Sequence, residues 1–313
     1  MLRSGLLWLS ERAGIFRLVR TNPLARRLAA RFVAGETIED AITAVKDLNA
    51  AGITATLDVL GESVSEAREA RAARDAYLAT LERVAQVGAQ SHVSLKLTQM
   101  GLDIDEGLCI ENTRAIIACA RSFGLFVRID MEGSAYTERT LRLYASRFHP
   151  EFGDAVGIVL QSYLRRTSRD TDDLIAARGR VRLCKGAYQE PPEVAFPKKR
   201  DVDANYISCM ERLLEKGNYP AIATHDEKII ARAKRIARDR GIAPDRFEFQ
   251  MLYGVRRDVQ LALRREGYRM RVYVPFGTQW YPYLMRRLAE RPANVAFLLG
   301  NLMKESLRRR GSA

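Results

Sequence analysis

The sequence is poor in the residues that build metal centres and disulfide scaffolds. Its 313 residues include only four cysteines and three histidines. The cysteines form no C-x-x-C pair and the histidines no H-x-x-x-H pair, so we expect neither a disulfide framework nor a metal site. The cysteines instead predict reduced core residues of a cytoplasmic protein. The chain also lacks any uncharged apolar run of about 18 residues, so we expect no membrane span.

Acidic residues are too few to balance the basic ones. The chain has 51 Lys and Arg against 38 Asp and Glu, which gives a net charge of +13 at pH 7. Such a surplus favours contact with phospholipid, nucleic acid or a phosphorylated ligand. No zinc finger, homeodomain or aromatic RNA-binding motif accompanies the basic residues, so we expect no nucleic-acid partner.

Residues 1–50 differ from the rest because Leu, Ile and Phe are interspersed there with arginines. Charges interrupt every apolar stretch, which predicts amphipathic helices rather than a secretory signal. Thr37, followed by Glu39 and Asp40, predicts the start of a helix over residues 38–51. We expect this segment to pack on the rest of the chain. The alternative is a peripheral contact with the inner face of the cell membrane.

Eight short apolar runs recur along the chain, and a helix-like stretch follows each of them. The runs are rich in Val, Ile, Leu and Phe, as parallel strands must be when both faces are buried. Eight such units in about 250 residues predict a (β/α)8 barrel of the TIM type, in the α/β class. The predicted strands are residues 53–61, 92–99, 126–133, 155–164, 181–188, 221–226, 247–254 and 270–277.

The stretches between these runs have the pattern of helices, and several end near a glycine, as helix C-termini commonly do. The predicted helices are residues 66–87, 106–123, 137–148, 201–216, 227–240, 256–265 and 280–291. No internal repeat or low-complexity linker interrupts the series. We therefore expect a single domain, in which residues 1–50 form an N-terminal helical segment and residues 51–313 form the barrel.

Polar or charged side chains stand near the end of almost every predicted strand. In a (β/α)8 barrel the carboxyl ends of the strands converge on one mouth, where active sites are found. The first candidates for a site are therefore Glu62, Lys96, Asp130, Gln161, Arg182, Lys185, His225, Gln250 and Tyr273.

Lys96 alternates with leucines in its predicted strand, so it faces the opposite side from them. A lysine inside a barrel requires an anionic partner, and Asp130 on the next strand can supply one. This pair is either a structural ion pair or part of a site. A Schiff-base lysine of the aldolase type is another interpretation of Lys96.

Two clusters of cations stand at other predicted strand and helix ends. Arg182 and Lys185 precede Gly186, and this combination suits an anionic ligand because glycine permits close approach to the backbone. Arg286 and Arg287 are adjacent in the last predicted helix, and paired guanidinium groups suit bidentate recognition of a carboxylate. Each cluster taken alone is also typical of an exposed, solvated surface.

Taken together, these segments resemble the proline dehydrogenase family. The resemblance runs from about residue 30 to about residue 300 and follows the order of the family's motifs. It is carried by S-L-K-L-T-Q around Lys96, I-D-M-E around Asp130, Q-S-Y-L-R-R-T, R-L-C-K-G-A-Y-Q-E-P, A-T-H-D, F-E-F-Q-M-L-Y-G, R-V-Y-V-P-F-G-T and Y-L-M-R-R-L-A-E-R-P-A-N. The resemblance is to the single-function bacterial type, and it is loose in the N-terminal helices.

The resemblance implies oxidation of L-proline to Δ1-pyrroline-5-carboxylate by hydride transfer to non-covalently bound FAD. This is the first step of proline catabolism to glutamate, and a membrane quinone is the implied electron acceptor. The implied FAD-binding residues are Met131, Gln161, Arg182, Lys185, Gly186, Ala187, Thr224 and His225. The implied substrate-binding residues are Lys96, Tyr188, Leu252, Tyr273, Tyr283, Arg286 and Arg287. Asp130, which orients the cations, and Arg182, beside the flavin ring, are the implied catalytic residues.

Glu62 follows the first predicted strand and so lies at the same mouth as the arginine pair. We predict that Glu62 pairs with one of these arginines and acts as a gate over the bound substrate. A solvated loop carboxylate is the alternative interpretation.

Two other functions stay open on the sequence. The first is a barrel aldolase that uses Lys96, which borohydride trapping would reveal and a yellow colour on purification would contradict. The second is a non-enzymatic nucleic-acid-binding protein, which would bind DNA with steep salt dependence and hold no flavin.

Overall fold

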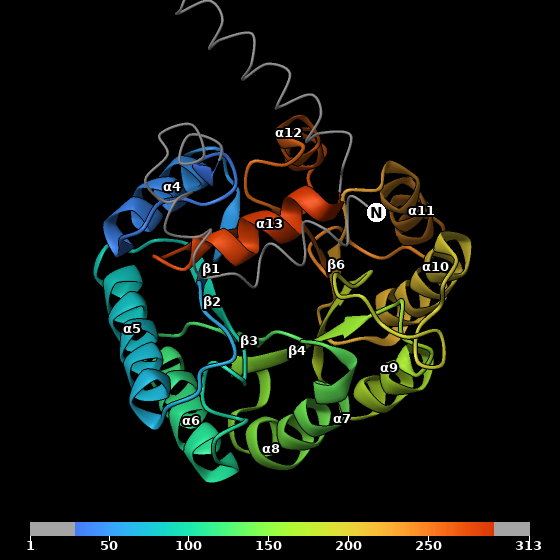
Figure 1. Ribbon diagram of the computed structural model, residues 1–313. Helices are drawn as coiled ribbons and strands as arrows, with labels where there is room; N and C mark the ends of the chain where they lie inside the picture. Colours follow the sequence, from blue (N-terminus) through green and yellow to red (C-terminus); the bar gives the residue numbers. More distant parts are fainter. Residues whose placement is uncertain (1–28, 291–313) are drawn as a thin grey trace, which may run out of the picture.

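The chain folds into a closed barrel of eight parallel strands that follow one another in sequence order, from β1 to β8. The last strand pairs with the first, and a ring of helices surrounds the strands (Figure 1). The computed structural model describes residues 29–290, apart from the side chains of Arg286 and of residues 288–290. The predicted TIM-type barrel is confirmed.

The strands β1 to β7 are shorter than the predicted apolar runs, because only the residues that share ladder hydrogen bonds belong to the sheet, whereas β8 has the predicted length and begins one residue earlier. They are β1 (Thr54–Val59), β2 (Ser91–Leu95), β3 (Val127–Ile129), β4 (Val156–Gln161), β5 (Arg180–Cys184), β6 (Ala221–Ala223), β7 (Glu248–Leu252) and β8 (Arg269–Phe276).

The helices lie between the strands, as predicted. They are α4 (Ile38–Ala50), α5 (Ala67–Gln86), α6 (Glu106–Ser122), α7 (Ser134–Leu143), α8 (His149–Phe152), α9 (Thr167–Ala176), α10 (Lys199–Lys216), α11 (Glu227–Asp239), α12 (Arg257–Arg265) and α13 (Trp280–Glu290). A π-helical turn, η1 (Tyr144–Phe148), and a 3-10 turn, η2 (Gly153–Ala155), flank α8. Within residues 29–290, no helix is long and apolar enough to cross a membrane.

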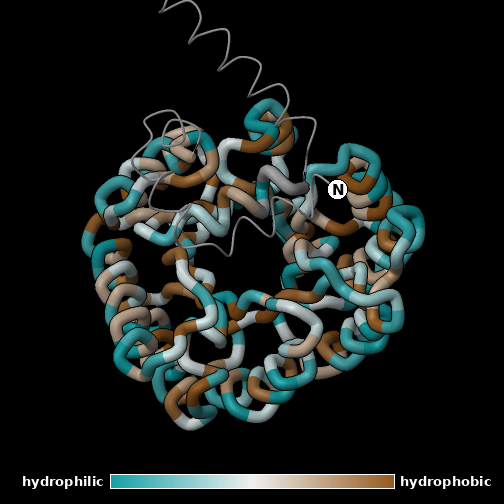
Figure 2. The backbone as a smooth tube through the Cα atoms, viewed as in Figure 1, coloured by the Kyte–Doolittle hydropathy of each residue, from teal (hydrophilic) through white to brown (hydrophobic). Residues whose placement is uncertain are grey.

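Side chains on the strands alternate between two environments. Those directed outward are apolar, such as Leu57, Leu95 and Ile129, and they pack in the main hydrophobic core with the helices. The helices in turn are largely hydrophilic on their outer faces (Figure 2). Many side chains directed into the barrel are instead polar and buried: Thr56, Asp58, Ser94, Arg128, Asp130, Arg182, Glu248, Gln250 and Arg271. The barrel interior is therefore available for charged groups.

Helix α4 begins where the sequence predicts, at a capping box. Thr37 Oγ1 accepts a hydrogen bond from the Asp40 amide at 3.1 Å, and the Asp40 carboxylate accepts one from the Thr37 amide at 3.0 Å. These bonds satisfy two amides that the helix itself leaves without partners. The helix packs on β1 and β8. Residues 1–28, where the rest of the N-terminal helical segment is predicted, lie outside the described residues.

Helix α13 has a different position from the other helices. Figure 1 shows it crossing the opening of the barrel, inside the ring formed by the others. Its buried residues Trp280, Tyr281 and Leu284 pack in a small apolar cluster with Ala29 and Val33. This separate cluster holds α13 over the carboxyl ends of the strands, where it can contribute to a site.

Candidate active site

A large cavity opens at the carboxyl ends of the strands, and we call it the mouth cavity. Its volume is about 580 Å³, which is in the range of sites for small molecules and cofactors. Among the described side chains, every predicted site residue except Glu62 contributes to its wall. These residues are Lys96, Asp130, Met131, Gln161, Arg182, Lys185, Gly186, Ala187, Tyr188, Thr224, His225, Gln250, Leu252, Tyr273, Tyr283 and Arg287.

Lys96 and Asp58 form a buried ion pair in this wall. Lys96 directly follows β2, and its Nζ lies 3.1 and 3.3 Å from the two carboxylate oxygens of Asp58 in β1. Their side chains are only 10% and 1% exposed. Burial opposes the charge on Lys96, but Asp58 and Asp130 outweigh it and raise the pKa of this ammonium group. The prediction that Asp130 is the direct partner of Lys96 is wrong.

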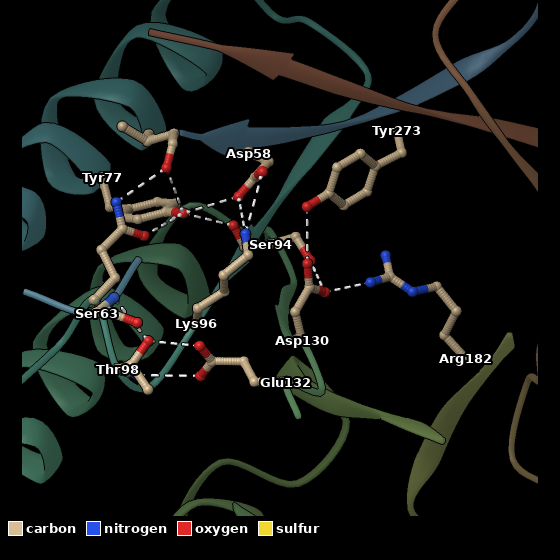
Figure 3. A network of polar contacts seen from close by, with 12 residues as sticks. Asp58, Ser63, Tyr77, Ser94, Lys96, Thr98, Asp130, Glu132, Arg182 and Tyr273 are labelled. Atoms are coloured by element: carbon tan, nitrogen blue, oxygen red, sulfur yellow. Dashed lines mark hydrogen bonds and ion pairs between the residues drawn. The ribbon is translucent and has the colours of Figure 1, made fainter. Parts of the chain in front are cut away.

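The carboxylate of Asp130 is held by groups other than Lys96 (Figure 3). Its Oδ1 accepts hydrogen bonds from Ser94 Oγ and Arg182 Nη2, and its Oδ2 accepts one from Tyr273 Oη at 2.8 Å. Burial disfavours the carboxylate, but Arg182 and Lys96 outweigh it and lower the pKa of Asp130. Asp130 therefore stays ionised and fixes the positions of Arg182 and Tyr273.

Two further side chains, Tyr77 and Glu132, form hydrogen bonds next to this charged wall. Tyr77 of α5 donates a 2.7 Å hydrogen bond to the Ser94 carbonyl, and its hydroxyl lies 3.4 Å from Asp58 Oδ1. Glu132 accepts hydrogen bonds from Thr98 Oγ1 at 2.5 Å and from the Thr98 amide at 3.2 Å. Burial raises the pKa of Glu132 to about 7, against the effect of these bonds. A carboxyl group with a pKa near neutral pH thus lies next to the wall without lining the cavity.

The rim after β5 combines a cation with a required glycine. Lys185 Nζ lies 2.6 Å from Asp203 and 2.8 Å from Asp226, so two carboxylates hold the ammonium at the cavity edge. Gly186 has a φ of +110°, and a Cβ at this position would collide with the ring of Tyr163. The chain therefore passes close to Tyr163 and presents Lys185 and the backbone of Gly186 to the same ligand space.

His225 follows β6 and is oriented by the next strand. The Leu252 amide in β7 donates a 3.0 Å hydrogen bond to His225 Nε2. This bond requires an unprotonated Nε2, so in the neutral ring the proton sits on Nδ1. The neighbouring Thr224 hydroxyl accepts a bond from the Asp226 amide at 3.1 Å. The end of β6 thus presents a fixed imidazole and hydroxyl to the mouth cavity.

Gln161 has a buried acceptor atom that receives no hydrogen bond from the described residues. Its Nε2 donates to the Met131 carbonyl at 3.4 Å, whereas its Oε1 has no hydrogen-bond partner among the described residues. Buried polar atoms are nearly always paired, so this oxygen fits a ligand that carries an N–H group, as a flavin ring does. The cations and hydroxyl along the same wall suit the anionic remainder of FAD. Within residues 29–290, no group of three His, Cys, Asp or Glu side chains is placed to hold a metal ion.

Helix α13 supplies the outer wall of the mouth cavity. Tyr283 and Arg287 both line it, and the Arg287 guanidinium lies 5.2 Å from the centre of the Tyr283 ring. The side chain of Arg286 lies outside the described residues. Glu62 is half-buried, does not line the mouth cavity, and raises the pKa of Lys96 electrostatically. Its predicted pairing with an arginine, and hence its role as a gate, stays a prediction.

Several residues that line the mouth cavity were not predicted from the sequence. They are Asp58, Val159, Cys184, Lys199, Ala223, Asp226 and Met251. Asp58 had a visible signal, since a carboxylate inside an otherwise apolar run must point toward a polar interior. The small and apolar residues among them could not be identified from the sequence, because such residues occur equally on the outer face of a strand.

A closed (β/α)8 barrel with charged strand ends around one cavity is the architecture of a barrel enzyme. The family model for proline dehydrogenase matches residues 41–299. The chain belongs to the proline dehydrogenase family and is an oxidoreductase of that family.

Its similarity to single-function members extends over nearly the whole of each chain. Proline dehydrogenase 2 of Bacillus subtilis (strain 168) is 43% identical over 303 residues, which cover 97% of this chain and 99% of the relative. Proline dehydrogenase of Deinococcus radiodurans is 44% identical over 306 residues, which cover 96% and 98%. The predicted resemblance to the single-function type is confirmed.

A solved structure has the same barrel as part of a larger chain. It is proline utilization A from Bdellovibrio bacteriovorus, inactivated by N-propargylglycine, with a TM-score of 0.81 and 28% identity. The match covers 88% of this chain and 34% of the larger one. The Escherichia coli (strain K12) bifunctional protein PutA, 28% identical, likewise matches over 24% of its length.

Proposed function

We propose that this protein oxidises L-proline to Δ1-pyrroline-5-carboxylate with non-covalently bound FAD, as the first step of proline catabolism to glutamate. The observation that carries the proposal is the mouth cavity, in which Lys96 and Arg182 lie on one wall and Arg287 on another. Such a cavity combines cations for a substrate carboxylate with room for an organic cofactor. Family membership supplies the class of reaction.

FAD, when bound, would accept the hydride from the proline carbon next to nitrogen. Arg182 and Lys185 would bind its anionic groups, and Gln161 Oε1 would accept a hydrogen bond from its ring. Met131, Gly186, Ala187, Thr224 and His225 complete the lining on this side. Asp130 keeps Arg182 in a fixed position, so this cation needs no rearrangement as negative charge develops nearby.

The substrate carboxylate would lie between Lys96 on the strand side and Arg286 and Arg287 on α13. The raised pKa of Lys96 keeps its amine protonated, which suits carboxylate binding and opposes the Schiff-base chemistry of an aldolase. Tyr188, Leu252, Tyr273 and Tyr283 would enclose the pyrrolidine ring. Binding both ends of the substrate fixes the reacting carbon, and correct alignment of the reactants supplies much of the rate enhancement.

Glu62 is proposed to close the site by pairing with Arg286 or Arg287 when substrate is bound. Replacing Glu62 with Gln should slow flavin reduction in stopped-flow measurements at saturating proline. The Glu66→Gln variant, in an exposed cap of α5, is the matched control. Equal rates in both variants would contradict a gating role.

The electron acceptor is proposed to be a membrane quinone, reached by peripheral contact of the basic N-terminal segment with the cytoplasmic face of the membrane. The support is the net charge of +13 and the mixture of apolar and basic residues before residue 30. The protein should sediment with anionic liposomes at low salt, and deleting residues 1–28 should abolish this. Binding that survives the deletion would contradict the proposal.

The central test is spectroscopic. The purified protein should show flavin absorbance bands, and acid precipitation should release the flavin into solution. L-Proline added without oxygen should bleach these bands, whereas D-proline should not. Absence of flavin, or a spectrum unchanged by L-proline, would overturn the proposed function.

A further inference from the structure

A second, much smaller cavity lies inside the barrel, toward the amino ends of the strands, and we call it the floor cavity. Its volume is about 10 Å³, which is room for one particle the size of a water molecule. Arg182 lines both cavities, so its guanidinium stands between the floor and the mouth. Arg182 is the one implied FAD-binding residue that lines the floor cavity. None of the implied substrate-binding residues that the structure describes lines it.

The floor cavity is surrounded by a surplus of positive charge. Four arginines line it, namely Arg128, Arg180, Arg182 and Arg271, against the single carboxylate of Glu248. Arg271 Nε lies 2.9 Å from Glu248, and Arg182 pairs with Asp130 on the mouth side. Among the described residues, neither Arg128 nor Arg180 forms an ion pair. The guanidinium groups of buried Arg128 and half-buried Arg180 thus line the same small space, and neither has a carboxylate in direct contact among the described residues.

Arg128 is the more deeply buried of the two, with only 3% of its surface exposed. Its Nη1 donates to the carbonyls of Ile158 at 3.2 Å and Arg180 at 2.5 Å. Burial and the neighbouring Arg182 and Arg180 lower the pKa of Arg128 to about 9. Gly157 makes room for this arrangement, since a Cβ there would lie 2.5 Å from Arg128 Nη1. The sequence therefore maintains a cation here at an electrostatic cost.

The other polar atoms around the floor cavity are also mainly donors. Arg180 Nε is buried and has no hydrogen-bond partner among the described residues. The Phe126 amide donates to His92 Nδ1 at 3.3 Å. Burial and the surrounding arginines hold the pKa of His92 well below its usual range, so the ring is neutral. With Nδ1 as acceptor, Nε2 of His92 carries the proton and is a further donor.

We propose that the floor cavity binds one small monovalent anion of the halide class, chloride under ordinary conditions. An anion there would neutralise part of the charge on Arg128 and Arg180. It would also accept hydrogen bonds from the N–H groups that line this cavity. The volume admits a single atom and excludes sulfate, phosphate and carboxylates. Such an anion would stabilise the barrel interior beneath the mouth cavity without entering the reaction.

The first test is thermal unfolding of the flavin-loaded protein at constant ionic strength, with chloride replacing gluconate. Specific binding predicts a saturable rise in Tm of roughly 2–4 °C as chloride exceeds its dissociation constant. The Arg128→Met variant should lose this rise. The Arg68→Met variant removes the same charge from an 87% exposed side chain and should keep it. A Tm that shows no saturable chloride dependence, or the same dependence in both variants, would overturn the proposal.

The second test needs no variant and so does not depend on Arg128→Met folding. Crystals of the unmodified protein grown in sodium bromide should show an anomalous scattering peak in the floor cavity, within hydrogen-bond distance of Arg128 and Arg180. Water alone at this position, with no anomalous signal, would refute the anion site.

Discussion

The two cavities of the barrel interior are both lined by charged side chains, yet they differ more than fiftyfold in volume, about 580 against about 10 Å³. Both place arginine and carboxylate side chains at alternate positions on neighbouring strands. The mouth is wide where small residues such as Gly186, Ala187 and Ala223 line it, whereas Phe126 and long arginines fill the floor. Side-chain size therefore decides which end of the barrel takes an organic ligand.

Charge balance separates the two ends as clearly as volume does. At the mouth, the cations of Lys96 and Arg182 are each matched by a carboxylate within direct contact, Asp58 and Asp130. At the floor, Arg271 has such a partner in Glu248, whereas Arg128 and Arg180 form no ion pair among the described residues. Cations that are paired with carboxylates can still bind a charged ligand through the groups that remain exposed, whereas buried cations without such a partner favour the binding of a counter-ion.

The largest effect is expected from Arg182→Met, because this residue separates the two cavities. Breaking a buried ion pair costs roughly 3–5 kcal/mol of unfolding free energy, and the loss of this cation should also reduce flavin content. Denaturant unfolding and the ratio of flavin to protein absorbance measure the two effects. Arg269→Met, at the exposed start of β8, is the control and should change neither. Full flavin content in Arg182→Met would contradict the role of Arg182 at the mouth.

Arg287→Met tests the mouth alone. Loss of a cation that binds the substrate carboxylate should weaken substrate binding by roughly 2–5 kcal/mol of free energy. The value of kcat/KM for L-proline should fall accordingly, mainly because KM rises. Flavin content and the chloride dependence of Tm should be unchanged, because Arg287 lines the mouth cavity and not the floor cavity. Steady-state kinetics with a soluble artificial acceptor provide the measurement. An unchanged KM would remove Arg287 from the substrate site.

Asp58→Asn tests how the mouth maintains its charge. Asp58 raises the pKa of Lys96, so the ammonium stays protonated over a wider pH range. Without the carboxylate the pKa should fall by about 1–3 units, and Lys96 should lose its charge at a correspondingly lower pH. The alkaline limb of the pH profile of kcat/KM should therefore shift to lower pH. The Asp58→Glu variant should return this limb to the wild-type position. Coincident profiles for wild type and Asp58→Asn would show that Asp58 has only a structural role.

The smallest effect is expected from Glu132→Gln, and it appears only as a pH dependence. Burial raises the pKa of Glu132 from its ordinary value of 4.5 to about 7. Between these values the folded state binds more protons than the unfolded state, so stability falls as pH rises. This contribution approaches about 1.4 kcal/mol per pH unit between pH 5 and pH 6.5. The variant should lack it, and parallel stability curves for the two proteins would contradict the assignment.

Features with local causes could be predicted from the sequence. The start of α4 depends only on Thr37 and Asp40, which are three residues apart. The strands β1 to β8 are likewise indicated by short apolar runs, and the carboxyl end of each strand identifies its side of the barrel. For this reason the charged and polar strand ends of the mouth cavity could be anticipated from position, whereas residues such as Met131, Gly186 and Tyr283 were implied only by the family resemblance.

Features that depend on packing across the barrel could not be predicted. The partner of Lys96 is Asp58 rather than Asp130, whose carboxylate instead accepts hydrogen bonds from Arg182 and Tyr273 across the barrel. The floor cavity was also hidden, because the apolar runs that identify the strands also contain its arginines and Glu248. Which of these side chains face each other depends on strand register, and register is fixed only when the barrel closes.

The pairing of β8 with β1 also determines when the protein becomes active during its synthesis. Thr54 and Met270, hydrogen-bonded partners across this seam, are 216 positions apart in the chain. The edge of β1 must therefore wait for β8 to leave the ribosome, and contacts of such long sequence separation form slowly. Helix α13 is made later still. A nascent chain thus carries neither a closed interior nor a complete mouth until almost all of the described residues have been translated.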